Sequence, residues 1–206
     1  MELTDAASWD ETALVHTAQR GNLDAFNELL LHYQTQAYNL AYHLLQDPAA
    51  ADDATQEACI SAYRNLAQFR GGSFRAWLLR IVTNACYDAL RHAKRRPSVS
   101  WEAFGDLEEE ANPHLRDRAE LPEEAVERDE LRQLLEDALA RLPEDQRTVL
   151  VLVDRLGLSY EEVAETLQIQ LGTVKSRLAR ARGKMRDLLL EQRELLPYRY
   201  RLDNRV

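Results

Sequence analysis

The stretch from Ser159 to Arg186 constrains the fold of this chain most, because it predicts two short helices joined by a turn. Ser159 and Glu162 have the spacing of a capping box, which starts a helix, and the apolar residues that follow recur at helical intervals. We expect this helix to end near Gln168, and we expect Thr173 to cap the next one. The pattern is a helix-turn-helix, a motif whose second helix suits the major groove of DNA.

The second of these helices is strongly basic. Between Gly172 and Arg186 it carries six cations and no acidic residue, namely Lys175, Arg177, Arg180, Arg182, Lys184 and Arg186. A merely solvated helix is the alternative, but solvated faces usually mix both signs, whereas a purely cationic helix suits a polyanion. Gln168 stands where such turns often have glycine, and a left-handed backbone there would cost about 1 kcal/mol.

The net charge of -9 is compatible with a nucleic-acid partner, because the charges are segregated along the chain. Residues 70–96 contain seven Lys or Arg and one acidic residue, whereas residues 98–130 contain three Arg and twelve acidic residues. The 45% hydrophobic content is ordinary for a globular protein. The acidity is therefore concentrated in one stretch that separates two basic ones.

Nothing in the sequence indicates catalysis, a metal or a cofactor. The histidines are scattered, and we find no nucleophile–base pair or phosphate-binding glycine loop, so we expect no enzyme and no small-molecule substrate. Cys59 and Cys86 lack zinc-ligand spacing and fit a reduced, cytoplasmic protein. No apolar run approaches the length of a membrane span, and the first residues are unlike a secretory signal, so we expect no direct membrane insertion.

Helical periodicity runs through the first half of the chain. We expect helices from Asp10 to Gly21, from Asn22 or Asp24 to the Asp47–Pro48 break, from about Ala50 to Ala67, and from Phe74 to Arg96. Two glycines make residues 69–73 a loop. The last of these helices interleaves basic and aromatic residues, which suits single-stranded nucleic acid because cations bind phosphates and flat side chains stack on unpaired bases. For Phe74 and Trp77, packing in the core is an equal alternative.

The second half begins with an acidic, proline-containing stretch of little periodicity, which we expect to be a mostly extended linker. A leucine stripe from Leu131 to Leu142 then predicts a helix, and Pro143 opens another that ends at Gly157. We therefore predict an all-α fold: a helical domain at residues 10–97, an acidic linker at 98–124 and a helix-turn-helix domain at 125–196. We expect the two small domains to be separate.

Four segments together resemble the extracytoplasmic-function, or group IV, sigma factors of the bacterial sigma-70 family. In chain order they are DDATQEACISAYRNL at 52–66, FRGGSFRAWLLRIVTNACYDALRHAKRR at 69–96, LPEDQRTVLVL at 142–152 and YEEVAETLQIQLGTVKSRLARAR at 160–182. The resemblance covers about residues 10–192. It implies that the first domain is a sigma region 2 and the second a sigma region 4, and the linker is too short for the middle domain of housekeeping sigma factors.

The resemblance also implies partners: core RNA polymerase, promoter DNA with -35 and -10 elements, and an anti-sigma factor. The residues that it places on polymerase are Asp52, Asp53, Gln56, Glu57, Ile60, Tyr63 and Arg64. Those that it places on the -10 element are Phe69, Arg70, Gly71, Gly72, Ser73, Trp77, Arg80, Asn84, Tyr87, Asp88 and Arg91. Those that it places on the -35 element are Thr173, Lys175, Ser176, Arg177, Arg180 and Arg182.

Two other classes of function stay open from the sequence. A helix-turn-helix transcriptional regulator would bind duplex promoter DNA without core polymerase, but it explains only the last of the four segments. A helical adaptor would bind no nucleic acid even at low salt. A sigma factor instead needs core polymerase, fixes its register on the -35 duplex, and offsets an unstacking cost of a few kcal/mol by trapping an extruded -10 base.

Overall fold

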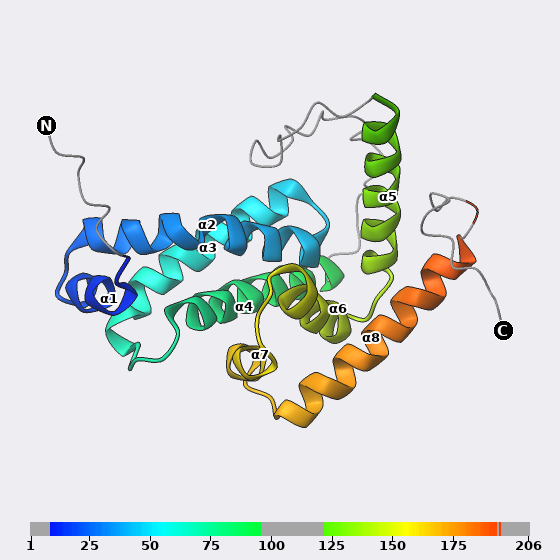
Figure 1. Cartoon of the computed structure of the whole chain (residues 1–206). Helices are drawn as coiled ribbons and strands as arrows, with labels where there is room; N and C mark the ends of the chain where they lie inside the picture. The colour runs from blue at the N-terminus through cyan, green and yellow to red at the C-terminus, as the bar shows by residue number, and fades with distance from the viewer. Residues whose placement is uncertain (1–8, 96–121, 193, 195–206) are drawn as a thin grey trace, which may run out of the picture.

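The computed structural model describes residues 9–95, 122–192 and 194, and within these residues the regular elements are all helical. The predicted all-α fold is confirmed. Figure 1 shows the helices of the first half of the chain lying beside those of the second half. The stretch from residue 98 to 121, which was predicted to be linker, lies outside the described residues, as does the end of the predicted second domain at 195–196.

The first domain is built from helices whose starts were marked in the sequence. Its elements are α1 (Glu11–Gln19), α2 (Leu23–Leu45), α3 (Pro48–Asn65), the 3-10 turn η1 (Leu66–Gln68) and α4 (Phe74–Arg95). Asp10, Asn22 and Asp47 each accept a hydrogen bond from a backbone N–H three residues later, which caps α1, α2 and α3. Pro48 opens α3 two residues before the predicted start, because proline fits the first turn of a helix.

The second domain contains the predicted helix-turn-helix. Its elements are α5 (Pro122–Ala140), α6 (Glu144–Leu150), the π-helical turn η3 (Val151–Arg155), α7 (Tyr160–Leu167) and α8 (Leu171–Glu191). Residues 122–124, which we assigned to the linker, therefore belong to α5. Gly157 was predicted to end the helix that Pro143 opens, and it follows the π-helical turn with φ +68°, a backbone that favours glycine. The π-helical turn itself was not predicted.

The turn between α7 and α8 confirms one prediction and corrects another. Ser159 and Glu162 form both hydrogen bonds of the capping box, and Gln168 ends α7 with a left-handed backbone at φ +53°. The expected N-cap at Thr173 is wrong, because the N–H of Thr173 already donates to the carbonyl of Gln170 at 2.8 Å. Helix α8 therefore begins at Leu171, with Thr173 inside its first turn.

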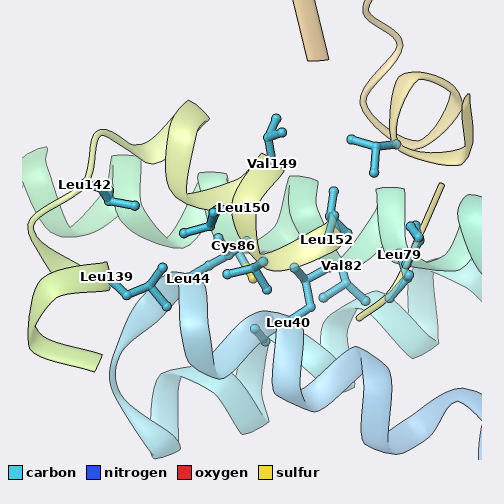
Figure 2. Close-up of a cluster of buried hydrophobic side chains, with 14 of the residues drawn as sticks. Leu40, Leu44, Leu79, Val82, Cys86, Leu139, Leu142, Val149, Leu150 and Leu152 are labelled. Carbon is cyan, nitrogen blue, oxygen red and sulfur yellow. The ribbon is translucent and has the colours of Figure 1, made fainter. Parts of the chain in front are cut away.

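The two domains are packed against each other, whereas the sequence predicted separate domains. One cluster of buried side chains joins α2 and α4 of the first domain to α5, α6 and η3 of the second. Figure 2 shows members of this cluster from both domains: Leu40, Leu44, Leu79, Val82, Cys86, Leu139, Leu142, Val149, Leu150 and Leu152. Apolar helix positions look the same in sequence whether their own domain or a neighbouring one covers them. We call this packing the closed arrangement.

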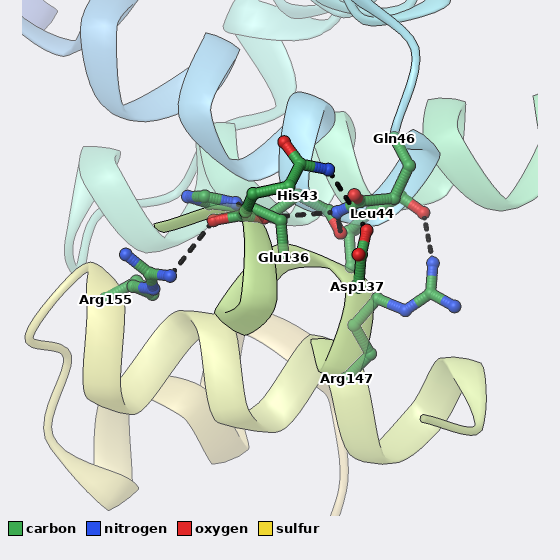
Figure 3. Close-up of polar contacts among 8 residues, drawn as sticks. His43, Leu44, Gln46, Glu136, Asp137, Arg147 and Arg155 are labelled. Carbon is green, nitrogen blue, oxygen red and sulfur yellow. Dashed lines mark hydrogen bonds and ion pairs between the residues drawn. The ribbon is translucent and has the colours of Figure 1, made fainter. Parts of the chain in front are cut away.

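A polar cluster around Glu136 accompanies the apolar contact. The Glu136 carboxylate, with its side chain 9% exposed, accepts from His43 Nδ1 of α2 and from Arg155 of η3, each at 3.0 Å. In addition, Arg147 donates to the carbonyl of Leu44 at 2.8 Å (Figure 3). Burial by itself raises the pKa of Glu136. The hydrogen bond and charge of His43, together with the charge of Arg155, lower the pKa by more than burial raises it, so it lies below its ordinary value.

Candidate nucleic-acid and protein interfaces

The outer face of α3 carries the residues predicted to bind polymerase. Alanines occupy its inner face and are buried, which turns the opposite face outward: Ala51, Ala54, Ala58 and Ala62. All of the predicted docking residues are exposed: Asp52, Asp53, Gln56, Glu57, Ile60, Tyr63 and Arg64. Ile60 and Tyr63 expose 47% and 51% of their surface, which is high for such side chains. A surface hollow on the same face is lined by Asp53, Gln56, Glu57, Ile60, Ser61, Arg64 and Asn65.

The predicted base-capture loop lies between η1 and α4. Gly71 and Gly72 have φ values of +100° and +89°, a backbone that other residues rarely adopt, and both are exposed together with Arg70. Ser73 caps α4, because the N–H of Ala76 donates to its Oγ at 3.1 Å. Phe69 differs from the expectation of a DNA-facing side chain, since it is only 9% exposed.

An aromatic cluster packs in the domain core next to this loop. The Phe69 ring lies 5.2 Å from the Trp77 ring and 5.9 Å from the Phe74 ring, centroid to centroid. Phe74 is fully buried, while Trp77 is half-buried. For Phe74 the core alternative is therefore the one that the structure supports. Trp77 packs in the core and also keeps some surface.

The remaining -10 residues share one side of α4, because their spacing follows the helical repeat. Asn84, Asp88 and Arg91 are exposed, and Asp88 forms an ion pair with Arg91. Arg80 and Tyr87 are half-buried. The structure thus brings the loop and this flank together on one domain.

The second domain covers part of this -10 surface. Tyr87 Oη shares a hydrogen bond with Thr148 Oγ1 of α6 at 2.8 Å, and burial raises the pKa of Tyr87. Lys94, near the end of α4, forms an ion pair with Glu144 of α6. Near the start of α4, Arg75 donates to the carbonyl of Leu156 at 2.6 Å.

The loop itself also meets the second domain. A side-chain carbon at Gly72 would lie 3.1 Å from a carboxylate oxygen of Glu165 in α7. An acidic group at this place would repel a DNA phosphate. Sequence reasoning missed the contacts that Arg75, Thr148 and Glu165 make between the domains, because each contact joins residues more than sixty positions apart and has no local signature.

The predicted -35 residues lie on helix α8, where some side chains are exposed and others pair with acidic residues. Val174, Leu178 and Ala181 face the core as expected. Lys175, Ser176 and Arg180 are exposed, and Thr173 is half-buried. The other two cations bind acidic residues of the same domain: Arg177 pairs with Asp145 at 3.1 Å, and Arg182 donates two hydrogen bonds to Asp154 at 3.0 and 2.6 Å.

In residues 9–95, 122–192 and 194, no group of three or more His, Cys, Asp or Glu side chains is placed to hold a metal ion. In the same residues, no helix has the length and apolar character to cross a membrane.

Comparison with known proteins gives matches to both domains. Residues 29–96 match the family described as Sigma-70 region 2, and residues 132–185 match Sigma-70, region 4. The RNA polymerase sigma-H factor of Pseudomonas aeruginosa is 42% identical over 170 residues, which cover 82% of this chain and 88% of that protein. The ECF RNA polymerase sigma-E factor of Escherichia coli K12 is 37% identical over 182 residues, which cover 84% and 90%.

A solved structure extends the similarity to the fold. CnrH, in complex with the cytosolic domain of CnrY, matches with a TM-score of 0.66 at 26% identity, over 88% of this chain and 99% of that one. A region 2 domain followed by a region 4 domain with a helix-turn-helix defines the class of RNA polymerase sigma factors. This chain belongs to the sigma-70 family, in its extracytoplasmic-function branch.

Proposed function

We propose that this chain binds core RNA polymerase and directs it to promoters whose -35 and -10 elements it recognises. The observation that carries the proposal is that one chain presents three surfaces of the required chemistry in the order of the family. These surfaces are the exposed outer face of α3, the glycine loop with the basic flank of α4, and the cationic helix α8. The named relatives are RNA polymerase sigma factors, which supports the same function.

The outer face of α3 is the proposed polymerase contact. Its exposed carboxylates and amide are mixed with Ile60 and Tyr63, and a combination of apolar anchors with a polar surround is typical of protein interfaces. The hollow beside Gln56 and Arg64 offers a place for a partner side chain. All of the predicted docking residues stay exposed in the closed arrangement.

Helix α8 is the proposed reader of the -35 duplex. Lys175, Ser176 and Arg180 are exposed and can reach base edges or phosphates directly. To bind DNA, Arg177 must first leave Asp145, which costs about 1 kcal/mol or less for a partly exposed ion pair. Arg182 is held more firmly, because it donates two hydrogen bonds to the carboxylate of Asp154. An arginine with two hydrogen bonds to one guanine discriminates by about 1 to 3 kcal/mol.

The loop at residues 69–73 is the proposed site of base capture in the -10 element. Its exposed glycines let a nucleotide approach the backbone closely, while Asn84 and Arg91 lie on the flank that follows. Phe69 is buried beneath the loop, so we assign it a supporting role in place of stacking on a base. No covalent step enters this mechanism.

The closed arrangement adds a step to the proposal. Tyr87 is bonded to Thr148, and Glu165 lies against the loop, so the -10 surface is partly covered while the α3 face is exposed. We propose that the domains separate when the chain forms the holoenzyme. The related CnrH was solved in complex with the cytosolic domain of another protein, CnrY. We propose that this chain likewise has a protein partner in the cytoplasm, an anti-sigma factor.

Transcription from purified components tests the proposal. Core polymerase of a related bacterium, a library of bacterial promoter fragments and this chain should together give transcripts with defined start sites. Core polymerase alone and the chain alone should give none. A helix-turn-helix regulator would instead bind duplex promoter DNA without polymerase, and that result with no polymerase-dependent transcript would reject the sigma function.

A further inference from the structure

Helix α1 lies before the segment that matches region 2, and its polar side chains hold both ends of the predicted base-capture loop. On the N-terminal side, Gln19 Nε2 donates to the carbonyls of Leu66 at 3.0 Å and Phe69 at 2.7 Å. These two contacts reach across about fifty residues of chain. The second contact holds the carbonyl of Phe69, the residue at which the chain leaves the domain core and the loop begins.

On the other side of the loop, Glu11 holds the first residue of α4. Glu11 Oε1 accepts from the N–H of Phe74 at 3.1 Å, and Glu11 Oε2 accepts from the hydroxyl of Tyr33. A helix N-terminus favours a negative charge, so this carboxylate stabilises the start of α4 in addition to the Ser73 cap. Burial and then Glu11 raise the pKa of Tyr33, which keeps the hydroxyl as a donor.

Helix α1 is itself firmly attached to the domain. Val15 and Ala18 are buried in the same cluster as Phe69 and Phe74. At its start, the Trp9 ring stacks on His32 of α2 with centroids 3.8 Å apart and planes within 14°. The anchors at Glu11 and Gln19 are therefore set on a packed helix.

The residues between the two anchors need such support. Gly71 and Gly72 are exposed, and glycine has more backbone freedom than any other residue. A flexible loop loses this freedom when it binds, and holding its ends in advance reduces that loss. We infer that Glu11 and Gln19 are positioning residues, which preorganise the loop at residues 70–73 for capture of one unpaired base. This inference rests on the proposed function of the loop.

Four single variants of the full chain test the inference. Gln19→Met and Glu11→Met keep the length of the side chain but remove its hydrogen bonds to the loop ends. Glu11→Gln keeps an oxygen that can accept from the N–H of Phe74, so it serves as the conservative variant. Gln34→Met, at an exposed position of α2, is the matched control.

The first measurement is base discrimination. Holoenzyme made with the wild-type chain selects its preferred single-stranded six-nucleotide -10 sequence from a random pool, and all single-base substitutions of that sequence are then compared. At the most strongly selected position, the affinity ratio of preferred to substituted base should fall about tenfold in both Met variants. Glu11→Gln and Gln34→Met should stay close to wild type, and all four should bind core polymerase equally.

The second measurement needs no DNA. The NMR order parameters of the Gly71 and Gly72 amides in the free chain should fall in both Met variants to about 0.6 or below, the range of flexible backbone. Preserved order parameters and preserved discrimination in both Met variants would overturn the positioning role alone. A wild-type holoenzyme with no base preference in the selection would overturn base capture by the loop, and the functional part of this inference with it.

Discussion

Helices α3 and α4 are neighbours in one domain, yet their proposed partner faces differ in accessibility. The docking face of α3 is exposed from Asp52 to Arg64. The DNA face of α4 is partly covered, because Tyr87 bonds to α6, Lys94 pairs with α6 and Arg75 bonds to the carbonyl after η3. We therefore propose that the closed chain first meets polymerase through α3, and that the domains then separate as the holoenzyme forms, which frees α4 for promoter DNA.

The two kinds of contact that close the chain contribute differently. The apolar cluster shared by the domains stabilises closure by burying apolar surface, and this stabilisation does not depend on direction. The Glu136 cluster is directional, because its carboxylate binds His43 of one domain and Arg155 of the other at fixed distances. A buried carboxylate without such partners is costly, so Glu136 favours this one register of the two domains over other apolar packings.

The largest expected effect concerns the exposed side of the comparison. Asp53→Ala combined with Gln56→Ala should weaken binding to core polymerase by about thirtyfold, the effect of removing a central interface contact worth about 2 kcal/mol. Because both side chains are exposed, the melting temperature should not change. Titration of labelled core polymerase measures the affinity.

The matched control for this pair is Asp24→Ala combined with Glu28→Ala, which removes two exposed side chains from α2. It should leave the affinity for polymerase unchanged. Equal affinity of the Asp53/Gln56 double variant and the wild type would show that polymerase binds elsewhere. The exposed face of α3 would then have no role in polymerase binding.

The next effect concerns the covered side. Glu136→Ala leaves His43 and Arg155 without their shared carboxylate and should shift the chain toward open forms by about 1 to 2 kcal/mol. Cys86 reports this shift, since it is fully buried in the cluster between the domains, and burial raises the pKa of its thiol to about 12. Alkylation of Cys86 should therefore become about tenfold faster.

The half-buried Cys59 of α3, outside that cluster, is the internal standard, and its rate should not change. Asp137→Ala removes an exposed carboxylate from the next position of α5 and should behave as wild type. Circular dichroism must show that Glu136→Ala keeps its helices. An unchanged Cys86 rate in a folded Glu136→Ala variant would refute the role of this cluster in closure.

Much of the fold could be predicted from the sequence because its signals are local. The capping box at Ser159 and the caps at Asp10 and Asn22 each act within one helical turn, and the periodicity of buried residues fixed the helix faces. Thr173 misled because a good capping residue also fits inside a first turn. The exposure of the α3 face followed from its alanine stripe, which a helical repeat reveals.

What the sequence could not reveal depends on contacts between distant residues. In the sequence His43 is one of several scattered histidines, and Glu136, which it contacts, lies 93 residues further along the chain. In the same way, nothing near Gln19 in the sequence indicates that its amide binds the carbonyl of Phe69. The contacts that close the chain and those that support the loop are therefore visible only in the folded structure. The proposed binding surfaces that they affect were predicted from local sequence patterns.

The smallest expected effect is the pH dependence of closure. The pKa of Glu136 in the folded chain lies below its ordinary value of 4.5, so opening takes up protons as the pH falls. The stabilisation by Glu136 is fully present above about pH 4.5 and is lost as the pH falls through the lower folded value. The Cys86 alkylation rate, corrected for the rate of Cys59, should therefore rise below pH 4.5 in the wild-type chain by less than the tenfold change of Glu136→Ala.

Two variants separate this effect from general acid sensitivity. Glu136→Gln cannot titrate, so its corrected Cys86 rate should be nearly flat across the same range. Glu162 also has a lowered pKa, first because the backbone N–H of Ser159 donates to its carboxylate, but it acts within the capping box of α7. Glu162→Gln should therefore keep the acid-dependent rise of Cys86. If Glu136→Gln kept the full rise instead, the proton that opens the chain would bind at another carboxylate, and the covered state of α4 would not depend on Glu136.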